Sequence, residues 1–178
     1  MITLRELTPA DIPAVRRIYS GASVRFTHAR PFTIERARER VSRAVAAAGE
    51  TSRSRWDFGI VHAQDLVGLI SLSVRERGTG TLSYILREDT WGHGYATEAA
   101  HLVVAFAFTG AGTGAGLERL EAKHHPENPA SGRVLAKVGF TPAGTVDLFG
   151  KDGKDGTVSY PVYGLRRPAV GSSTDRLP

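Results

Sequence analysis

The stretch WGHGYATEAAHLVVAFAF, residues 91–108, places two glycines around a histidine and follows them at once with an alanine-rich apolar run. Glycine loses more conformational entropy on ordering than any other residue, so glycines before a helix indicate that backbone must face something there. A helix N-terminus offers unpaired N–H groups and a positive dipole end, for which phosphate is the usual ligand. The stretch predicts a helix that begins on an anion-binding turn, although a tight turn without a ligand gives the same pattern.

Segments with the character of strands precede and follow this helix. Residues 81–87, TLSYILR, alternate in polarity and lead into the turn, and residues 117–124, LERLEAKH, suit another strand. The intervening TGAGTGAG, residues 109–116, fits the nucleotide fingerprint G-x-G-x-x-A. That fingerprint must follow a strand and open a helix, whereas here it follows a helix, so a flexible connector is predicted.

The remaining segments complete one domain of alternating strands and helices. They are a strand at 2–7, a helix capped by Thr8, a helix at 33–49, hairpin strands at 56–61 and 66–74, a helix at 130–138 and closing strands at 145–150 and 158–166. Pro161 indicates an edge or a bulge in the last strand. The order predicts an α/β (α+β) domain over residues 1–168, with a mostly antiparallel sheet of about seven strands flanked by helices, and a disordered tail at 169–178.

Composition excludes several kinds of site and location. The chain has no cysteine, so no disulfide, thiolate zinc site or cysteine nucleophile is available. It shows neither a signal peptide nor an apolar run of about 18 residues, which predicts a soluble cytoplasmic protein without a membrane partner. The net charge of +5 suits a polyanionic coenzyme or a nucleic acid. Arg36, Arg38, Arg40 and Arg43 alternate with glutamates at helical spacing, which favours a solvated helix face over a nucleic-acid footprint.

Four segments taken together, TLSYILRED, WGHGYATEA, RLEAKHHPEN and PASGRVLAKVGF, resemble the GNAT superfamily of N-acetyltransferases, in its ribosomal-protein (Rim-type) branch. The resemblance covers nearly the whole chain, and the joint spacing is far more specific than any one segment. It implies an acetyl-CoA-dependent enzyme that acetylates a protein N-terminus or a small-molecule amine by direct transfer in a ternary complex. A domain of the same shape that binds acyl-CoA without turnover is the alternative, and either a monomer or a homodimer is compatible with the sequence.

The resemblance also implies a binding site for the coenzyme. The backbone of the glycine turn would hold the pyrophosphate, and a splayed strand end would receive the pantetheine arm. In the family pattern Q/R-x-x-G-x-G/A, Trp91 replaces the usual Gln or Arg, as in this branch. Arg133 and Lys137, at i and i+4 on a helix, are either ligands of the 3′-phosphate or ordinary surface charges. The expected binding set is Ile85, Leu86, Trp91, Gly92, His93, Gly94, Tyr95, Ala96, Thr97, Asn128, Arg133 and Lys137.

Acetyl transfer to an amine needs a proton acceptor for the amine and a proton for the leaving thiolate. In many relatives a helix tyrosine donates that proton, but Leu135 occupies its place here. The branch pattern N-x-x-S is present as Asn128 and Ser131, which the resemblance places at the pantetheine arm and the coenzyme sulfur; Asn128 as a plain helix cap is the alternative. If Ser131 is not the acid, the tyrosines to consider are Tyr84, Tyr160 and Tyr163.

Glu121 is the expected general base, and His124, His125 and Asp147 are further candidates. An α-amino group, with a pKa near 8, is easier to deprotonate than a lysine near 10.4, so a weak base suffices for a protein N-terminus. The adjacent histidines should point to opposite faces of a strand and so cannot share a metal, and no metal is expected. The irregular segments at 20–32 and 149–160 are expected to build the acceptor pocket.

Overall fold

A single seven-stranded sheet forms the centre of the molecule. The computed structural model describes residues 1–27, 30–76, 78–110, 112–149 and 156–169. The strand order is β1-β2-β3-β4-β5-β7-β6, and every neighbouring pair is antiparallel except β4 and β5. The strands are β1 (Thr3–Glu6), β2 (Arg55–His62), β3 (Asp65–Glu76), β4 (Thr79–Leu86), β5 (Arg119–Lys123), β6 (Thr141–Phe149) and β7 (Thr157–Arg166). The predicted fold class, a mostly antiparallel sheet of about seven strands, is confirmed.

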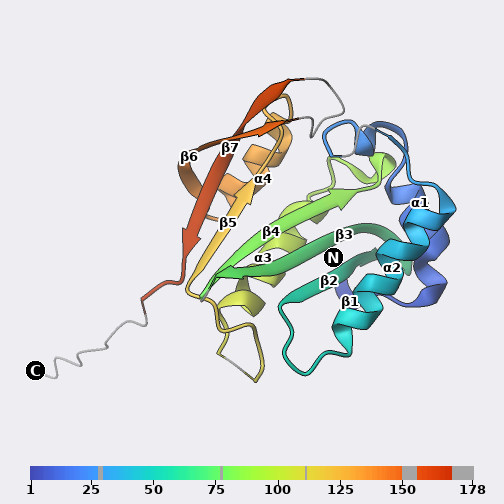
Figure 1. Ribbon diagram of the computed structural model, residues 1–178, viewed down its shortest axis with the longest axis horizontal. Helices are drawn as coiled ribbons and strands as arrows, with labels where there is room; N and C mark the ends of the chain where they lie inside the picture. Colours follow the sequence, from blue (N-terminus) through green and yellow to red (C-terminus); the bar gives the residue numbers. More distant parts are fainter. Residues whose placement is uncertain (28–29, 77, 111, 150–155, 170–178) are drawn as a thin grey trace, which may run out of the picture.

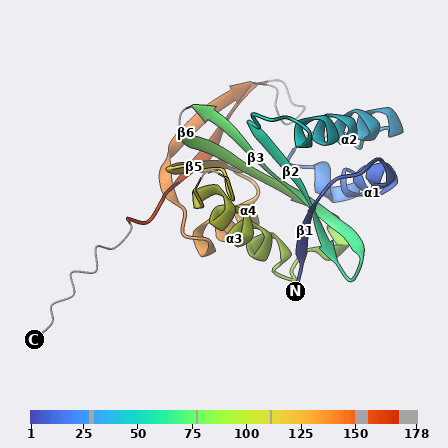
Figure 2. The same cartoon turned by 90° about the horizontal axis from the view of Figure 1, so that it is seen from below.

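Helices cover both faces of this sheet. α1 and α2 lie on one face and α3 and α4 on the other, as Figures 1 and 2 show. Their bounds are α1 (Ile12–Ile18), α2 (Ile34–Ala48), α3 (Tyr95–Phe108) and α4 (Pro129–Lys137), with 3-10 turns η1 (Pro9–Asp11), η2 (Gly21–Val24) and η3 (Glu88–Thr90). No helix among the described residues is both long and apolar enough to cross a bilayer.

Each face of the sheet carries its own apolar core. Ala99, Val103 and Ala107 of α3 are fully buried and pack in one cluster with sheet residues such as Leu82 and Leu120. The second cluster combines α1 and α2 with the opposite face of the sheet, and its members include Val15, Ile18, Val41, Leu69 and Ile85. The small alanines of α3 let that helix approach the sheet closely, which fixes the position of its N-terminus beside the end of β4.

The predicted α2 boundaries are confirmed by its caps. Thr33 is the N-cap, and its side chain accepts a hydrogen bond from the backbone N–H of Arg36 at 3.3 Å, while Gly49 follows the last turn. The hairpin of β2 and β3 closes through Ala63 and Gln64, both with positive φ, as a tight two-residue turn requires.

The C-terminal hairpin departs from the sequence prediction in two ways. β6 begins at Thr141, four residues before the predicted start, through a bulge between Pro142 and Gly144. Pro161 lies in β7, which is an interior strand between β5 and β6 rather than a sheet edge. The strand tolerates this proline because β5 ends opposite Val162, so β7 has a strand partner on only one side at Pro161. Residues 150–155 and 170–178, which include most of the expected tail, lie outside the described residues.

The parallel pair β4 and β5 separates at one end. Their pairing runs only from Thr79 to Leu82 on β4, and β5 ends at Lys123. β4 continues to Leu86 with β3 as its only strand partner among the described residues, and the two ribbons diverge in Figure 1. The end of β4 therefore has a backbone edge that no strand of the described chain pairs with, next to the glycine turn.

Candidate active site

The glycine turn presents bare backbone to open space. Gly92 and Gly94 have φ of +81° and +80°, a left-handed conformation that side chains with a Cβ rarely adopt. A Cβ added to either glycine would meet no atom of the described residues within 4 Å, so packing does not explain their choice. Gly94 is the N-cap of α3, and no side chain caps this helix. The first-turn N–H groups of a 14-residue helix are thus open to a ligand.

Aromatic side chains hold this turn in place from outside. The indole Nε1 of Trp91 donates to the carbonyl oxygen of Leu86 at 3.1 Å and ties the turn to the end of β4. His93 and Tyr95 stack with ring centroids 5.4 Å apart, and Tyr95 also contacts the ring of His62 at 4.6 Å. The imidazole Nδ1 of His93 lies 3.3 Å from the carbonyl oxygen of Thr90. These two rings support the turn rather than face the cavity described next.

A cavity of about 510 Å³, here called the turn cavity, lies between the glycine turn, the end of β4 and the start of α4. It brings together residues that are far apart in the sequence. Of the expected coenzyme-binding residues, His93 and Tyr95 are absent from its lining; those present are Ile85, Leu86, Trp91, Gly92, Gly94, Ala96, Thr97, Asn128, Arg133 and Lys137.

A second cavity of about 650 Å³, here called the arginine groove, lies on the α2 side of the sheet. α2 contributes Arg36 and Arg43 to its wall. The irregular segment after η2, one of the two segments expected to build the acceptor pocket, contributes Phe26 and Thr27. The floor is a set of hydroxyl side chains from β3 and β4, namely Ser71, Ser73, Thr81 and Ser83. The two cavities share the lining residues Phe26, Thr27, Tyr84, Ile85, Asn128 and Ser131, so they adjoin where β4 and β5 have separated.

The start of α4 is arranged around Asn128 and Ser131. The side-chain oxygen of Asn128 accepts from the backbone N–H of Ser131 at 3.3 Å, so Asn128 acts as the helix cap in this structure. The Tyr84 hydroxyl donates to the carbonyl oxygen of Ser131 at 3.1 Å. Burial raises the pKa of Tyr84 to about 12, so this phenol keeps its proton at neutral pH. The sequence gives Tyr84 as an alternative to Ser131 as the proton donor. Its alternation with Leu82 and Leu86 indicates that the three side chains lie on the same face of the sheet.

The arginine-rich face of α2 is not wholly solvated, contrary to the prediction. Arg40 forms an ion pair with Asp57 of β2 at 2.7 Å, and the two side chains are only 11% and 1% exposed. Asp57 also accepts from Arg55 and from Ser71. Burial alone would raise the pKa of Asp57, but hydrogen bonds from Arg55 and Arg40 outweigh it and lower the pKa to about 2. One feature of the sequence indicates this ion pair: Asp57 lies inside the apolar strand WDFGIV, and a buried carboxylate needs a buried partner.

The two adjacent histidines line the same groove, which corrects the expected strand alternation. β5 ends at Lys123, so His124 and His125 follow the strand instead of pointing to its opposite faces. The Nδ1 of His124 lies 2.7 Å from the carbonyl oxygen of His125, to which it can only donate, and the Nε2 of His124 is buried next to Gly132. Among the described residues no group of three or more histidine, cysteine or acidic side chains could hold a metal ion.

The two acidic base candidates lie outside both cavities. Glu121 pairs with Arg119 at 2.9 Å and is 40% exposed, and the β4–β5 register sets it opposite the groove residue Thr81. Asp147 accepts from the hydroxyl of Ser159 on the neighbouring strand. The structure thus brings Asn128 and Ser131 to the junction of the cavities and places His124 and His125 in the adjoining groove, while Glu121 and Asp147 line neither cavity.

Comparison with known proteins supports one family. Residues 1–141 match the family model of the acetyltransferase (GNAT) domain. The chain is 26% identical over 147 residues to the N-acetyltransferase p20 of Bacillus licheniformis, covering 80% of each chain. RimL, the ribosomal L7/L12 alpha-N-protein acetyltransferase solved with coenzyme A, shares the fold with a TM-score of 0.79 at 16% identity over 93% of both chains.

A second solved structure shares the same fold. The microcin C7 self-immunity acetyltransferase MccE, in complex with acetyl-CoA and AMP, has a TM-score of 0.77 at 15% identity over 93% of this chain and 92% of its own. Because the family match spans most of the chain, the chain belongs to the GNAT family of acetyltransferases.

Proposed function

We propose that this chain moves the acetyl group of acetyl-CoA directly to a primary amine, of a protein N-terminus or a small molecule, in a ternary complex. One observation carries the proposal: the turn cavity and the arginine groove share Tyr84, Ile85, Asn128 and Ser131 in their linings. A donor in the first cavity and an acceptor in the second would meet at these residues. RimL is by name a protein α-N-acetyltransferase, which supports an amine acceptor, and MccE was solved with acetyl-CoA, which supports acetyl-CoA as the donor.

The turn cavity fits the coenzyme by its own geometry. The bare backbone around Gly92 and Gly94 and the uncapped start of α3 suit a pyrophosphate. The edge of β4 near Leu86, which no described strand pairs with, is proposed to offer backbone groups to the amide-containing pantetheine arm, beside the Leu86 carbonyl that Trp91 holds. Arg133 and Lys137, which line the cavity at its α4 wall, are proposed to meet the remaining phosphate. When bound, acetyl-CoA supplies the activated acetyl group.

Ser131 is the proposed proton donor to the departing thiolate. It lines both cavities, as the donor must if it is to reach the reacting atoms. Tyr84 is the second candidate, because its phenol is protonated at neutral pH and already contacts the Ser131 carbonyl. Asn128 then has two tasks, capping α4 and contacting the donor, because its side chain has an NH₂ group besides the capping oxygen.

A weak base suffices for the acceptor if it is an α-amino group, which is neutral in part near pH 8. His124 and His125 line the groove and are the candidates inside it. Glu121 stays a predicted base, and its position outside both cavities means that it would act through a water molecule rather than by direct contact.

The test measures coenzyme binding and turnover on the same protein. We expect acetyl-CoA to bind, and thiol release from it to depend on an added amine, with peptides and small amines assayed side by side. Binding without thiol release for any amine in the panel would instead identify an acyl-CoA-binding module of the same fold. A Gly94→Val variant is the control: thiol release that persists unchanged in it, at an acetyl-CoA concentration near the wild-type Kd, would not arise in the turn cavity.

A further inference from the structure

The arginine groove carries a surplus of positive charge that its own structure does not neutralise. Glu39 is the one carboxylate among the described lining residues, whereas the basic lining residues are Arg36, Arg40, Arg43, Arg55, Arg75 and Lys123. Asp57, beneath the floor, neutralises part of the charge of Arg40 and Arg55. Arg36, Arg43, Arg75 and Lys123 form no ion pair with any described residue.

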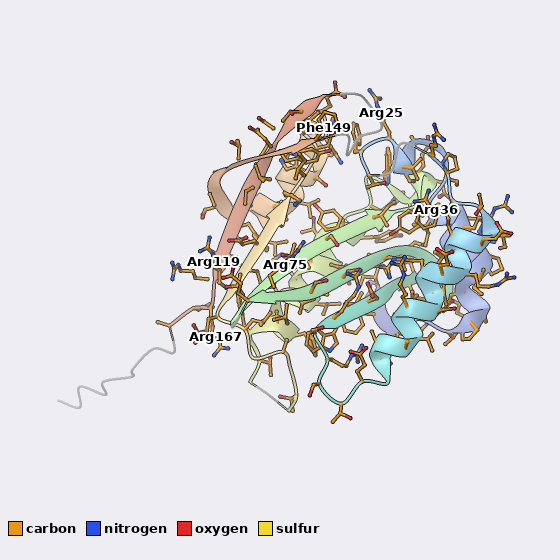
Figure 3. The ribbon with its side chains drawn as sticks, in the orientation of Figure 1. Arg25, Arg36, Arg75, Arg119, Phe149 and Arg167 are labelled. Atoms are coloured by element: carbon orange, nitrogen blue, oxygen red, sulfur yellow. The ribbon has the colours of Figure 1, made fainter. Side chains whose placement is uncertain are left out.

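These cations follow the length of the groove rather than converge on one point. Arg36, Arg40 and Arg43 are spaced i, i+4 and i+7 on α2, one helix face that is about 10 Å long. On the floor, β3 runs from Leu69, which pairs with Ile85 beside the turn cavity, to Arg75. Arg75 lies six residues after Leu69 on an extended strand, a distance of about 20 Å. Figure 3 shows Arg36 and Arg75 toward opposite ends of the sheet face that α2 borders.

The end of the groove beside the turn cavity is lined with aromatic rings, and arginines lie over two of them: Arg36 over Phe32 at 4.7 Å and Arg25 over Phe26 at 5.1 Å from the ring centroids. Tyr19 and Phe32 stack with ring centroids 4.0 Å apart, and the rings of Phe26 and His125 lie 5.4 Å apart. All four side chains line the groove, and Phe26 also lines the turn cavity. An acceptor whose amine is at Tyr84 and Ser131 would therefore place its first residue against these rings, and the cations of the groove would begin at Arg36 and continue along its length.

We propose that the acceptor amine is the N-terminus of an acidic peptide, a step that rests on the proposed acetyl transfer. An extended peptide rises about 3.3 Å per residue, so the 20 Å from the junction to Arg75 spans about six residues. Carboxylates from roughly the third residue onward would face the unpaired arginines, whose planar guanidinium groups bind carboxylates in bidentate fashion. The floor hydroxyls, Ser73, Thr81 and Ser83, offer hydrogen bonds to the peptide between these charges. A single compact anion would use only one part of this array.

The experiment compares matched peptides as acceptors. All three peptides begin with Ser-Ala and differ at positions three to six. The acidic peptide carries Asp and Glu there, its amide counterpart carries Asn and Gln, and the lysine peptide carries Lys. We expect kcat/KM for the acidic peptide to exceed that for its amide counterpart by about 10-fold or more at low salt, since each exposed charge pair contributes a factor of up to about five. The ratio should fall as ionic strength rises, because salt screens exposed charges, and the lysine peptide should be the poorest acceptor.

Substitutions of groove arginines test whether the preference for acidic peptides arises in the arginine groove. Arg43→Gln and Arg75→Gln should each lower the ratio of acidic to amide kcat/KM by about twofold to fivefold, because each removes one unpaired cation from the groove. Arg38→Gln is the matched control, since Arg38 is exposed on the same helix but does not line the groove. A ratio that changes as much in the control as in Arg43→Gln would overturn the assignment.

Binding and turnover together separate this inference from the proposed function. Affinity of each peptide is measured by fluorescence anisotropy in the presence of coenzyme A. Acid-selective binding that depends on Arg43 and Arg75, but without thiol release, supports the peptide site and refutes acetyl transfer. Acetylation of acidic and amide peptides at rates within twofold, or a small anionic amine preferred over every peptide, overturns the acidic-peptide acceptor and leaves acetyl transfer standing. Neither binding nor turnover with any peptide overturns both.

Discussion

Ser131 is the single residue on which the proposed chemistry depends most directly, since it lines both cavities. Ser131→Ala should lower kcat by about 10-fold to 100-fold, the low end of what general acids contribute, because a thiolate leaves well even with little assistance. Acetyl-CoA affinity should hardly change, because the contact strengthens mainly in the transition state. Steady-state kinetics with a separate binding measurement checks both. Ser131→Thr should keep part of the rate, because it retains the hydroxyl.

Tyr84→Phe is the companion variant that keeps the ring and removes only the hydroxyl. If Ser131→Ala turns over at the normal rate while Tyr84→Phe is slow, the proton comes from Tyr84, whose hydroxyl is hydrogen-bonded to the Ser131 carbonyl. A loss in both variants means that each residue contributes, directly or by holding the other in place. The acetyl-CoA dissociation constant of each variant shows whether binding has changed as well.

Asp57 is predicted to matter for stability rather than catalysis. Its folded pKa of about 2 lies below the ordinary value of 3.8, so its ionised form stabilises the fold above about pH 4, and this contribution is lost as the pH falls toward 2. Asp57→Asn should lower the free energy of unfolding at pH 7 by about 2 kcal/mol, and the difference from the wild type should shrink in acid. Urea unfolding of both proteins between pH 7 and pH 2.5 measures this difference in the free energy of unfolding. Asp147→Asn, which removes an exposed carboxylate, is the control and should cost under about 0.5 kcal/mol.

At the scale of elements, the glycine turn between β4 and α3 yields a clear ranking of variants. Gly94→Val should weaken acetyl-CoA binding far more than His93→Ala, because valine is strained at a φ of +80° and its branched side chain would fill the space in front of the backbone. His93 stacks on Tyr95 away from the turn cavity, so its loss removes no contact there. Calorimetric titration of each folded variant with acetyl-CoA measures the two dissociation constants and tests this ranking. A larger loss in His93→Ala would mean that the turn does not bind through its backbone.

Periodicity and caps predicted most elements of this fold. The 3.6-residue pattern between Thr33 and Gly49 marked α2, and the glycine pair before an apolar run marked α3, because both signals are local. The bulge that lets β6 start at Thr141 and the place of Pro161 in an interior strand depend on which strands pair, which a single sequence does not state. The ion pair of Arg40 with Asp57 was missed for the same reason: its partners are 17 residues apart on different elements.

The candidate site was predictable to the extent that its residues belong to short motifs. The turn cavity gathers most of the expected coenzyme residues, since the turn and the start of α4 are each a continuous segment. The arginine groove was not foreseen, because its walls come from α2, β3 and β4, and only the packing of α2 on the sheet turns a charged helix face into a groove wall. Residue types along α2 were visible in the sequence, but their orientation toward the sheet was not.

At the scale of the whole molecule, the turn cavity joins parts of the fold that are otherwise separate. Its lining comes from the end of β4, the start of α3 and the start of α4, so a ligand bound there links elements on one face of the sheet to the edge where β4 and β5 part. A ligand that binds only the folded state stabilises it by RT ln(1 + [L]/Kd), about 2.7 kcal/mol at a concentration 100-fold above Kd.

For a chain of this length each kcal/mol shifts the melting temperature by about 2–4 °C, so acetyl-CoA at that excess should raise Tm by roughly 5–10 °C. Free coenzyme A should raise Tm to a similar degree, because the contacts proposed for the pyrophosphate, the pantetheine arm and the 3′-phosphate do not involve the acetyl group. Scanning calorimetry with either ligand makes the measurement, and Gly94→Val, which blocks the backbone of the turn, should reduce the shift. An unmoved Tm in a large excess of both ligands would mean that the turn cavity is not a coenzyme site.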